Sequence, residues 1–153
     1  MKTRRRRPGV TAGLVALGVS LVLLSASGCG DLSRDELNRG VESLSALAAQ
    51  GELIANGVAR DATKSTYTRV MAKTLGGEAE HEAEKLADAE PSPEVSRERD
   101  TAVRVAGKLA GLYSELQTFP GDERRGALVE KQMGEVKEEA DAIVARLTGE
   151  PAP

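Results

Sequence analysis

The chain contains few of the residues on which most catalytic and metal centres depend. Its 153 residues include one cysteine, one histidine, no tryptophan, two tyrosines and one phenylalanine. A single thiol cannot form an intramolecular disulfide, and a single imidazole cannot supply the two histidines of a di-iron bundle. With so few aromatic residues among 40% hydrophobic ones, the composition favours helices with small and aliphatic cores over a large β-sandwich or barrel.

Positive charge is also scarce beyond the N-terminus. Five of the 21 basic residues, Lys2 and residues 4–7, lie in the first 28, which leaves 16 basic against 24 acidic side chains and a net charge near −8. Nucleic-acid binding rests on clustered Lys and Arg, and anionic headgroups weakly repel such a domain. We therefore expect no nucleic-acid partner, and any membrane attachment must have another source.

The first 28 residues have the architecture of an export signal. Charged residues 2–7 precede an apolar run from Val10 to Leu24, and small residues follow up to Cys29. This run of about 15 apolar residues is shorter than the roughly 20 that a spanning helix needs. We predict a cleaved signal peptide, with an uncleaved transmembrane anchor as the alternative.

The end of this segment, LSASGC at residues 24–29, resembles the lipobox of bacterial lipoproteins. Ser27, Gly28 and Cys29 match the family pattern, whereas Ala26 stands where the family prefers Leu. The resemblance covers residues 1–29 and implies cleavage between Gly28 and Cys29, with a diacylglyceryl group on the Cys29 thiol. It also implies attachment to the extracytoplasmic face of the cell membrane through acyl chains such as palmitate. Two acyl chains anchor a protein stably, because each buried methylene contributes about 0.8 kcal/mol to membrane binding.

Two points about this segment stay open in the sequence. A plain secretory signal with an incidental cysteine is the alternative to a lipoprotein signal. Cys29 favours the lipoprotein, because the chain's only cysteine stands where a lipid-accepting thiol belongs. The arginine run after Thr3 leaves the export route, general secretory or twin-arginine, undecided.

Local signals divide the rest of the chain into a tether at residues 29–32 and four helices. Ser33 and Glu36 form a capping-box pair, which predicts a first helix up to about residue 60. The polar stretch 61–65 predicts a turn before the second helix, which Pro91-Ser92-Pro93 ends.

The last two helices are bounded in the same way. Ser92 is expected to cap the third helix, with Pro93 at its first position, and that helix stops before residue 120. Asp122 is expected to cap the fourth helix, which Gly149 and Pro151 close.

Apolar and small residues recur at steps of three and four in each of these segments, the spacing that keeps one stripe on partner helices. Gly76-Gly77 interrupts the second segment at a cost of about 2 kcal/mol of helix propensity, so a kink or break is open there. The predicted stripes are Leu37, Val41, Leu44, Ala48, Gly51, Ala55 and Val58; Tyr67, Met71, Leu75, Ala79, Ala83 and Leu86; Val95, Ala102, Val105, Ala106, Leu109, Leu112, Tyr113 and Leu116; and Val129, Met133, Val136, Ala140, Ile143 and Leu147.

Four helices of about 26 residues each, joined by short turns, predict one all-α domain at residues 33–149. We expect an up-down-up-down four-helix bundle with a disordered tail at residues 150–153. Two long hairpins that pack less regularly, or a helical array in partial disorder, are the alternatives. Such a bundle has two turns at the end away from the N-terminus.

The aromatic residues Tyr67, Tyr113 and Phe119 all fall near that far end. A cap over the thin aliphatic core is the simpler interpretation, and a small apolar site or partner contact presented away from the membrane is the other.

Few motifs indicate chemistry. Glu78 and His81 have the E-x-x-H spacing of a metal site, but a zinc site here would be built mostly of carboxylates, a poor ligand set. We therefore expect His81 to be solvated. The sequence has no haem-attachment motif, no phosphate loop and no histidine placed beside a nucleophile. We expect no enzyme activity, no cofactor and no metal.

The sequence thus favours a lipid-anchored cell-envelope protein whose helical bundle engages a protein partner or serves a neighbouring membrane system. The alternative is a bundle that binds or senses a small molecule through its membrane-distal aromatic end.

Overall fold

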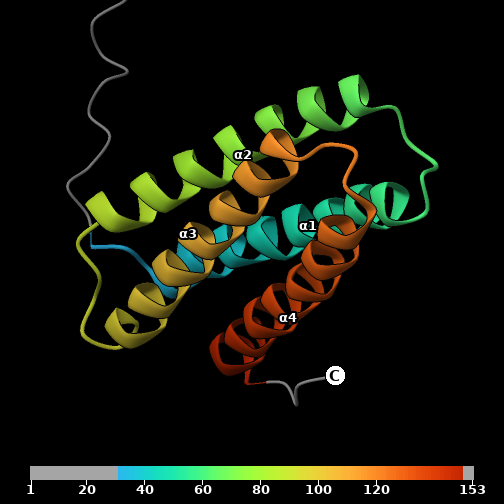
Figure 1. The fold of residues 1–153 in the computed structure, drawn as a ribbon. Helices are drawn as coiled ribbons and strands as arrows, with labels where there is room; N and C mark the ends of the chain where they lie inside the picture. The colour runs from blue at the N-terminus through green and yellow to red at the C-terminus, as the bar shows by residue number, and fades with distance from the viewer. Residues whose placement is uncertain (1–30, 150–153) are drawn as a thin grey trace, which may run out of the picture.

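The computed structural model describes residues 31–149, which form four antiparallel helices (Figure 1): α1 (Arg34–Ala59), α2 (Ser65–Asp88), α3 (Ser96–Thr118) and α4 (Glu123–Thr148). The predicted four-helix bundle is confirmed. Within this range no helix is both long and apolar enough to cross a membrane. The expected signal peptide, Cys29 and the tail at 150–153 lie outside the described residues.

The bundle is built from two tight helix pairs. α1 packs most closely against α4, and α2 packs most closely against α3, while α1 and α3 meet across the diagonal. Helices α2 and α4 do not contact each other. Because successive helices alternate in direction, the α1–α2 and α3–α4 turns lie at one end, which we call the distal end (Figure 1). The start of α1 and the α2–α3 turn lie at the other, proximal end.

The predicted caps of α1 and α4 are confirmed. The Ser33 hydroxyl accepts a hydrogen bond from the Glu36 N–H at 3.3 Å, and the Glu36 carboxylate accepts one from the Ser33 N–H at 3.0 Å. The Asp122 carboxylate accepts from the Arg125 N–H at 3.1 Å. Gly149 ends α4 in the left-handed region at φ 75°, which a glycine adopts without steric cost.

The predicted start of α3 is wrong by three residues. Residues 93–95 form a turn, in which the Val95 N–H donates to the Ser92 carbonyl at 3.1 Å, and α3 begins at Ser96 with Val95 as its N-cap. The reason is a backbone contact that local signals do not contain. Leu32 pairs with this segment: its N–H donates to the Glu90 carbonyl at 2.6 Å, and its carbonyl accepts from the Ser92 N–H at 3.4 Å. Ser92 therefore precedes a turn, and the helix begins only after that turn.

Leu32 was assigned from the sequence to the tether, but it belongs to the core. Its side chain is 8% exposed and packs with the buried residues of the bundle. The chain is thus fastened to the proximal end from residue 32 onward.

The predicted stripes of α1 and α4 are buried at every position, and that of α3 at every position except the partly buried Leu112. The stripe of α2 is wrong by one position at its start. Thr68 and Ala72 are fully buried, whereas Tyr67 is 52% exposed and Met71 is only partly buried against the core. The glycine pair does not break the helix.

Tyr113 explains the altered phase of α2. A Cβ atom at position 76 would lie 3.1 Å from the Tyr113 Cβ, so α2 presents Gly76 to this side chain. The neighbouring small residues Thr68, Ala72 and Ala79 then also face inward. Packing of α2 follows the volume of Tyr113 in α3 more than the size of the residues in α2.

Gly126 sets the closest approach between α1 and α4. A Cβ atom at this position would lie 2.7 Å from the backbone nitrogen of Ala59 and 2.9 Å from a Val58 methyl group. Backbone atoms cannot rotate away, so only glycine allows the start of α4 to rest on the end of α1.

We expect Gly126→Ala to lower the free energy of unfolding by about 1–3 kcal/mol in urea denaturation, because overpacking against backbone forces the helices apart. The control is Gly107→Ala, on the exposed side of α3, where a Cβ atom has nothing within 4 Å. In this control the free energy of unfolding should rise by up to about 1 kcal/mol, because alanine has a higher helix propensity than glycine. Equal stabilisation by both substitutions would contradict the close approach.

Candidate functional site

Tyr113 lies inside the bundle and joins three helices. Its side chain is 0% exposed, and its hydroxyl donates to the Leu47 carbonyl of α1 at 2.6 Å. The side chain starts beside Gly76 of α2, and its hydroxyl lies 3.0 Å from where a Cβ atom of Gly51 would be. Burial, together with the charge of Glu78, raises the pKa of the Tyr113 phenol above its usual range. Tyr113 is therefore a buried neutral donor and does not reach the distal surface.

Tyr67 and Phe119 do lie at the distal end, as expected. The two turns meet there, because a Cβ atom at Gly121 would lie 2.8 Å from the Ser65 hydroxyl. Phe119 is 39% exposed and lies under the Arg125 guanidinium, which is 3.7 Å from the ring centre. The structure thus leaves Tyr67 and Phe119 at the surface and does not bring Tyr113 together with them in one outward-facing site.

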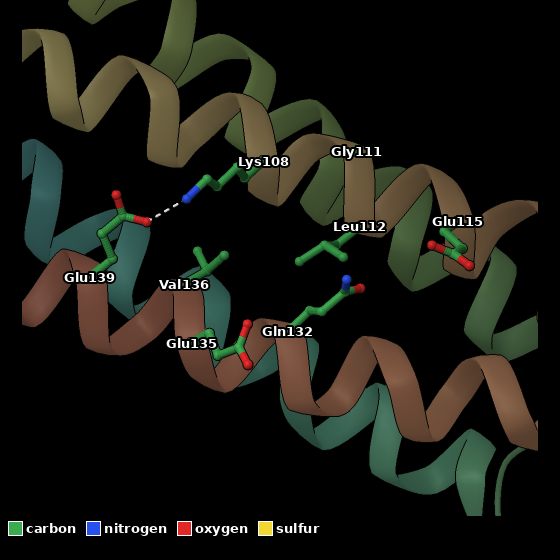
Figure 2. Close-up of a pocket in the computed structure, with 8 residues that line it drawn as sticks. All are labelled: Lys108, Gly111, Leu112, Glu115, Gln132, Glu135, Val136 and Glu139. Atoms are coloured by element: carbon green, nitrogen blue, oxygen red, sulfur yellow. Dashed lines mark hydrogen bonds and ion pairs between the residues drawn. The ribbon is translucent and has the colours of Figure 1, made fainter.

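An open groove with a volume of about 420 Å³ lies between α3 and α4 (Figure 2). Leu112 and Val136 point into it, and polar side chains surround them. All three of its carboxylates are paired with basic side chains, and the longest of these pairs joins Glu135 to Lys131 at 3.8 Å. Glu139 accepts from Lys108 at 2.6 Å and from Arg104 at 3.0 Å.

The Glu115 carboxylate accepts a hydrogen bond from the Arg125 guanidinium at 3.0 Å. The hydrogen bond from Lys108 is the main reason that the pKa of Glu139 lies below its ordinary value. No histidine, cysteine or serine is among the eight side chains that line this groove: Lys108, Gly111, Leu112, Glu115, Gln132, Glu135, Val136 and Glu139.

The E-x-x-H motif lies on the solvent-facing side of α2. Glu78 and His81 are both exposed, so the expectation that His81 is solvated is confirmed. Among residues 31–149, no three His, Cys, Asp or Glu side chains come together in a way that could hold a metal ion.

Charge divides the bundle along its length. The proximal half, residues 31–46, 77–107 and 136–149, has 8 basic and 16 acidic side chains. The distal half, residues 47–76 and 108–135, has 8 basic and 7 acidic side chains. The net charges are therefore −8 and +1, so the net negative charge of the bundle lies in the proximal half.

The distal half also carries a mixed apolar and cationic surface on α1 and α2, which we call the distal patch. All its members are exposed to solvent, and they lie on the last two turns of α1, the turn that follows, and the first three turns of α2. They are Leu53, Arg60, Lys64, Tyr67, Arg69, Val70 and Lys73.

Sequence reasoning identified only Tyr67 of this patch. A signal for the rest was present: residues 60–73 contain four basic residues and one acidic residue, and the acidic run of α2 follows directly. Leu53 and Val70 are apolar residues outside the predicted stripes, which also indicates exposure.

In Tyr67→Phe the only phenol left is Tyr113, which gives a direct test of its environment. We expect no phenolate absorbance while the protein is folded, and a signal that appears together with unfolding as the pH rises. The unfolded chain ionises at its ordinary pKa of about 10, whereas the folded state keeps the proton. The contribution of Tyr113 to stability is thus complete below about pH 10 and is lost above it.

The further variant Tyr67→Phe with Tyr113→Phe should lack this added loss and should be less stable by about 1 kcal/mol at neutral pH, since a buried hydrogen bond is removed. A phenolate signal from folded Tyr67→Phe protein near pH 10 would contradict the buried position.

The described surface therefore offers two candidate contact regions, the α3–α4 groove and the distal patch. No protein-family model, no curated protein and no solved structure matches this chain.

Proposed function

We propose that this protein is a lipid-anchored component of the cell envelope whose helical bundle engages a protein partner and catalyses no reaction. The export signal and the lipobox-like residues 24–29 support the anchor, with Cys29 as the acceptor thiol. The attachment of Leu32 to the proximal end is the structural observation that connects a lipid on Cys29 to the orientation of the bundle at the membrane.

Leu32 fixes which end of the bundle an anchor would hold. Its two backbone hydrogen bonds to the α2–α3 turn and its 8% exposure tie the start of the domain to the proximal end. The three residues from Cys29 to Leu32 span at most about 11 Å. A lipid on Cys29 would keep the proximal end next to the membrane. At 26 residues, α1 is about 39 Å long, so the distal end would stand well clear of it.

The surface chemistry supports binding over catalysis. The carboxylates Glu115 and Glu139 of the α3–α4 groove are engaged by basic side chains. His81, the chain's one histidine, is exposed on α2, away from this groove. The small-molecule alternative rested on three aromatic residues acting together, and Tyr113 is buried away from the other two.

The direct test is the intact mass of the protein recovered from the membrane fraction of its host. We expect the mass of residues 29–153 plus a diacylglyceryl group, and we expect Cys29→Ala to lose both the modification and the cleavage. The matched control is Ser27→Ala, which keeps a small residue in the lipobox and should be modified normally. An unmodified or uncleaved mass for the unaltered chain would overturn the anchor.

A further inference from the structure

Exposed large apolar side chains are confined to the distal half of the described residues. Leu53 is 76% exposed, Val70 58% and Tyr67 52%. The other two, Phe119 directly after α3 and Leu128 on α4, are also in the distal half. Exposed apolar groups that gather at one end of a small domain indicate an interaction surface.

Leu53, Tyr67 and Val70 share one flank of the bundle. A Cβ atom at Gly57 would lie 2.6 Å from the Thr63 methyl group, which marks where α1 meets the start of the α2 segment. Leu53 lies one helical turn before Gly57 on α1. Tyr67 lies in the first turn of α2, four residues after Thr63. Val70 is three residues beyond Tyr67, so it lies beside Tyr67 on α2.

The four cations of the distal patch are not used within the described fold. Arg60, Lys64, Arg69 and Lys73 form no ion pair with any residue from 31 to 149, whereas nine of the other twelve Lys and Arg side chains in that range do. Asp61 is the only acid between residues 60 and 73. The patch therefore carries a net charge near +3 in a domain that is negative overall.

Helix stability does not account for the cation at the start of α2. Lys64 is the N-cap of α2 and makes no side-chain cap, and the first turn of α2 has no acidic residue, whereas the first turns of α1, α3 and α4 each have at least one. A basic group at the positive end of a helix dipole is unfavourable by a few tenths of a kcal/mol. A residue that opposes local stability in this way is expected where it serves an external contact.

The shape of the patch selects a narrow partner. Along the outer side of α2, Val70 and Lys73 are followed by Glu80 and Glu84, which are exposed and acidic. A flat anionic surface that lay along Val70 would also meet these carboxylates. A flat surface that met the distal tip would reach the turn at residues 60–64 but not Leu53, two turns further down α1. An anionic polymer has no apolar group to cover Leu53 and Val70.

We infer that the distal patch is the docking surface for an acidic, amphipathic helical segment of a partner protein. Apolar side chains of that segment lie on Leu53, Tyr67 and Val70, and its Asp or Glu side chains face the patch cations other than Arg69, which lies on the far side of α2 from Tyr67. This inference rests on the partner-binding role proposed above and adds the place and the chemistry of the contact. It does not depend on the lipid, so the two can fail separately.

The test measures peptide binding to the full chain in phosphatidylcholine nanodiscs, with empty nanodiscs as the blank. If the chain is recovered in the soluble fraction, peptide binding is measured without nanodiscs. The probes are two labelled helical peptides with the same leucine positions, one with Glu and the other with Lys at every other site. We expect at least tenfold tighter binding of the Glu peptide, with an affinity that falls as salt is raised. Equal binding of both peptides, or no binding of the Glu peptide at millimolar concentration, would overturn the inference.

Two double variants separate the contribution of the cations to peptide binding from that of the apolar side chains. Lys64→Glu with Lys73→Glu should weaken binding of the Glu peptide at least tenfold and should gain binding of the Lys peptide, a gain that an unfolded protein cannot show. Leu53→Ser with Val70→Ser should weaken binding of the Glu peptide at least tenfold and leave its salt dependence unchanged.

The matched control is Arg39→Glu with Arg97→Glu. Both residues are exposed, lie outside the patch and form no ion pair within the described part of the chain. This pair changes the net charge equally and should leave binding unchanged. Equal weakening by the control pair, or binding only to phosphatidylglycerol vesicles, would contradict a docking surface for a protein segment.

Discussion

The buried hydroxyl of Tyr113 makes a hydrogen bond that joins the two tight helix pairs inside the core. It carries a side chain of α3 past Gly76 of α2 to the Leu47 carbonyl of α1. Together with the surface hydrogen bonds of Glu139 and Glu115 between α3 and α4, this diagonal contact sets the height at which the two pairs meet. Two glycines make room for it, Gly76 beside the Tyr113 Cβ and Gly51 beside its hydroxyl. An unpaired hydroxyl at this depth would cost about 1–3 kcal/mol, so the register of the bundle depends on it.

That register gives the bundle two different ends. Leu32 is fastened to the α2–α3 turn at the end where acidic side chains outnumber basic ones by two to one. The exposed apolar side chains and the unpaired cations of the α1–α2 segment lie toward the opposite end. An acyl anchor just before Leu32 would hold the acidic end at the membrane and present the distal patch away from it. The proposed anchor and the inferred contact thus use opposite ends of one helical bundle.

Local rules predicted most of this fold and little of its surface. Caps such as Ser33 with Glu36, and the stripes of α1 and α4, depend on residues three or four positions apart and were predicted correctly. The phase of α2 and the start of α3 depend on Tyr113 and on Leu32, which contact them from other segments, so local patterns were wrong there. The distal patch combines residues of two helices whose relative position only the tertiary structure gives, although its segregated charge was visible.

The most direct measurement of this polarity is the height of each end above a membrane. A fluorophore on Glu94→Cys at the proximal end, or on Thr66→Cys at the distal end, would be compared in vesicles that contain spin-labelled lipid and the lipidated protein. We expect strong quenching of the label at residue 94 and little at residue 66, because α1, with 26 residues, separates the two ends by about 39 Å. Equal quenching at the two positions, or stronger quenching at residue 66, would contradict an anchored proximal end and an outward distal patch.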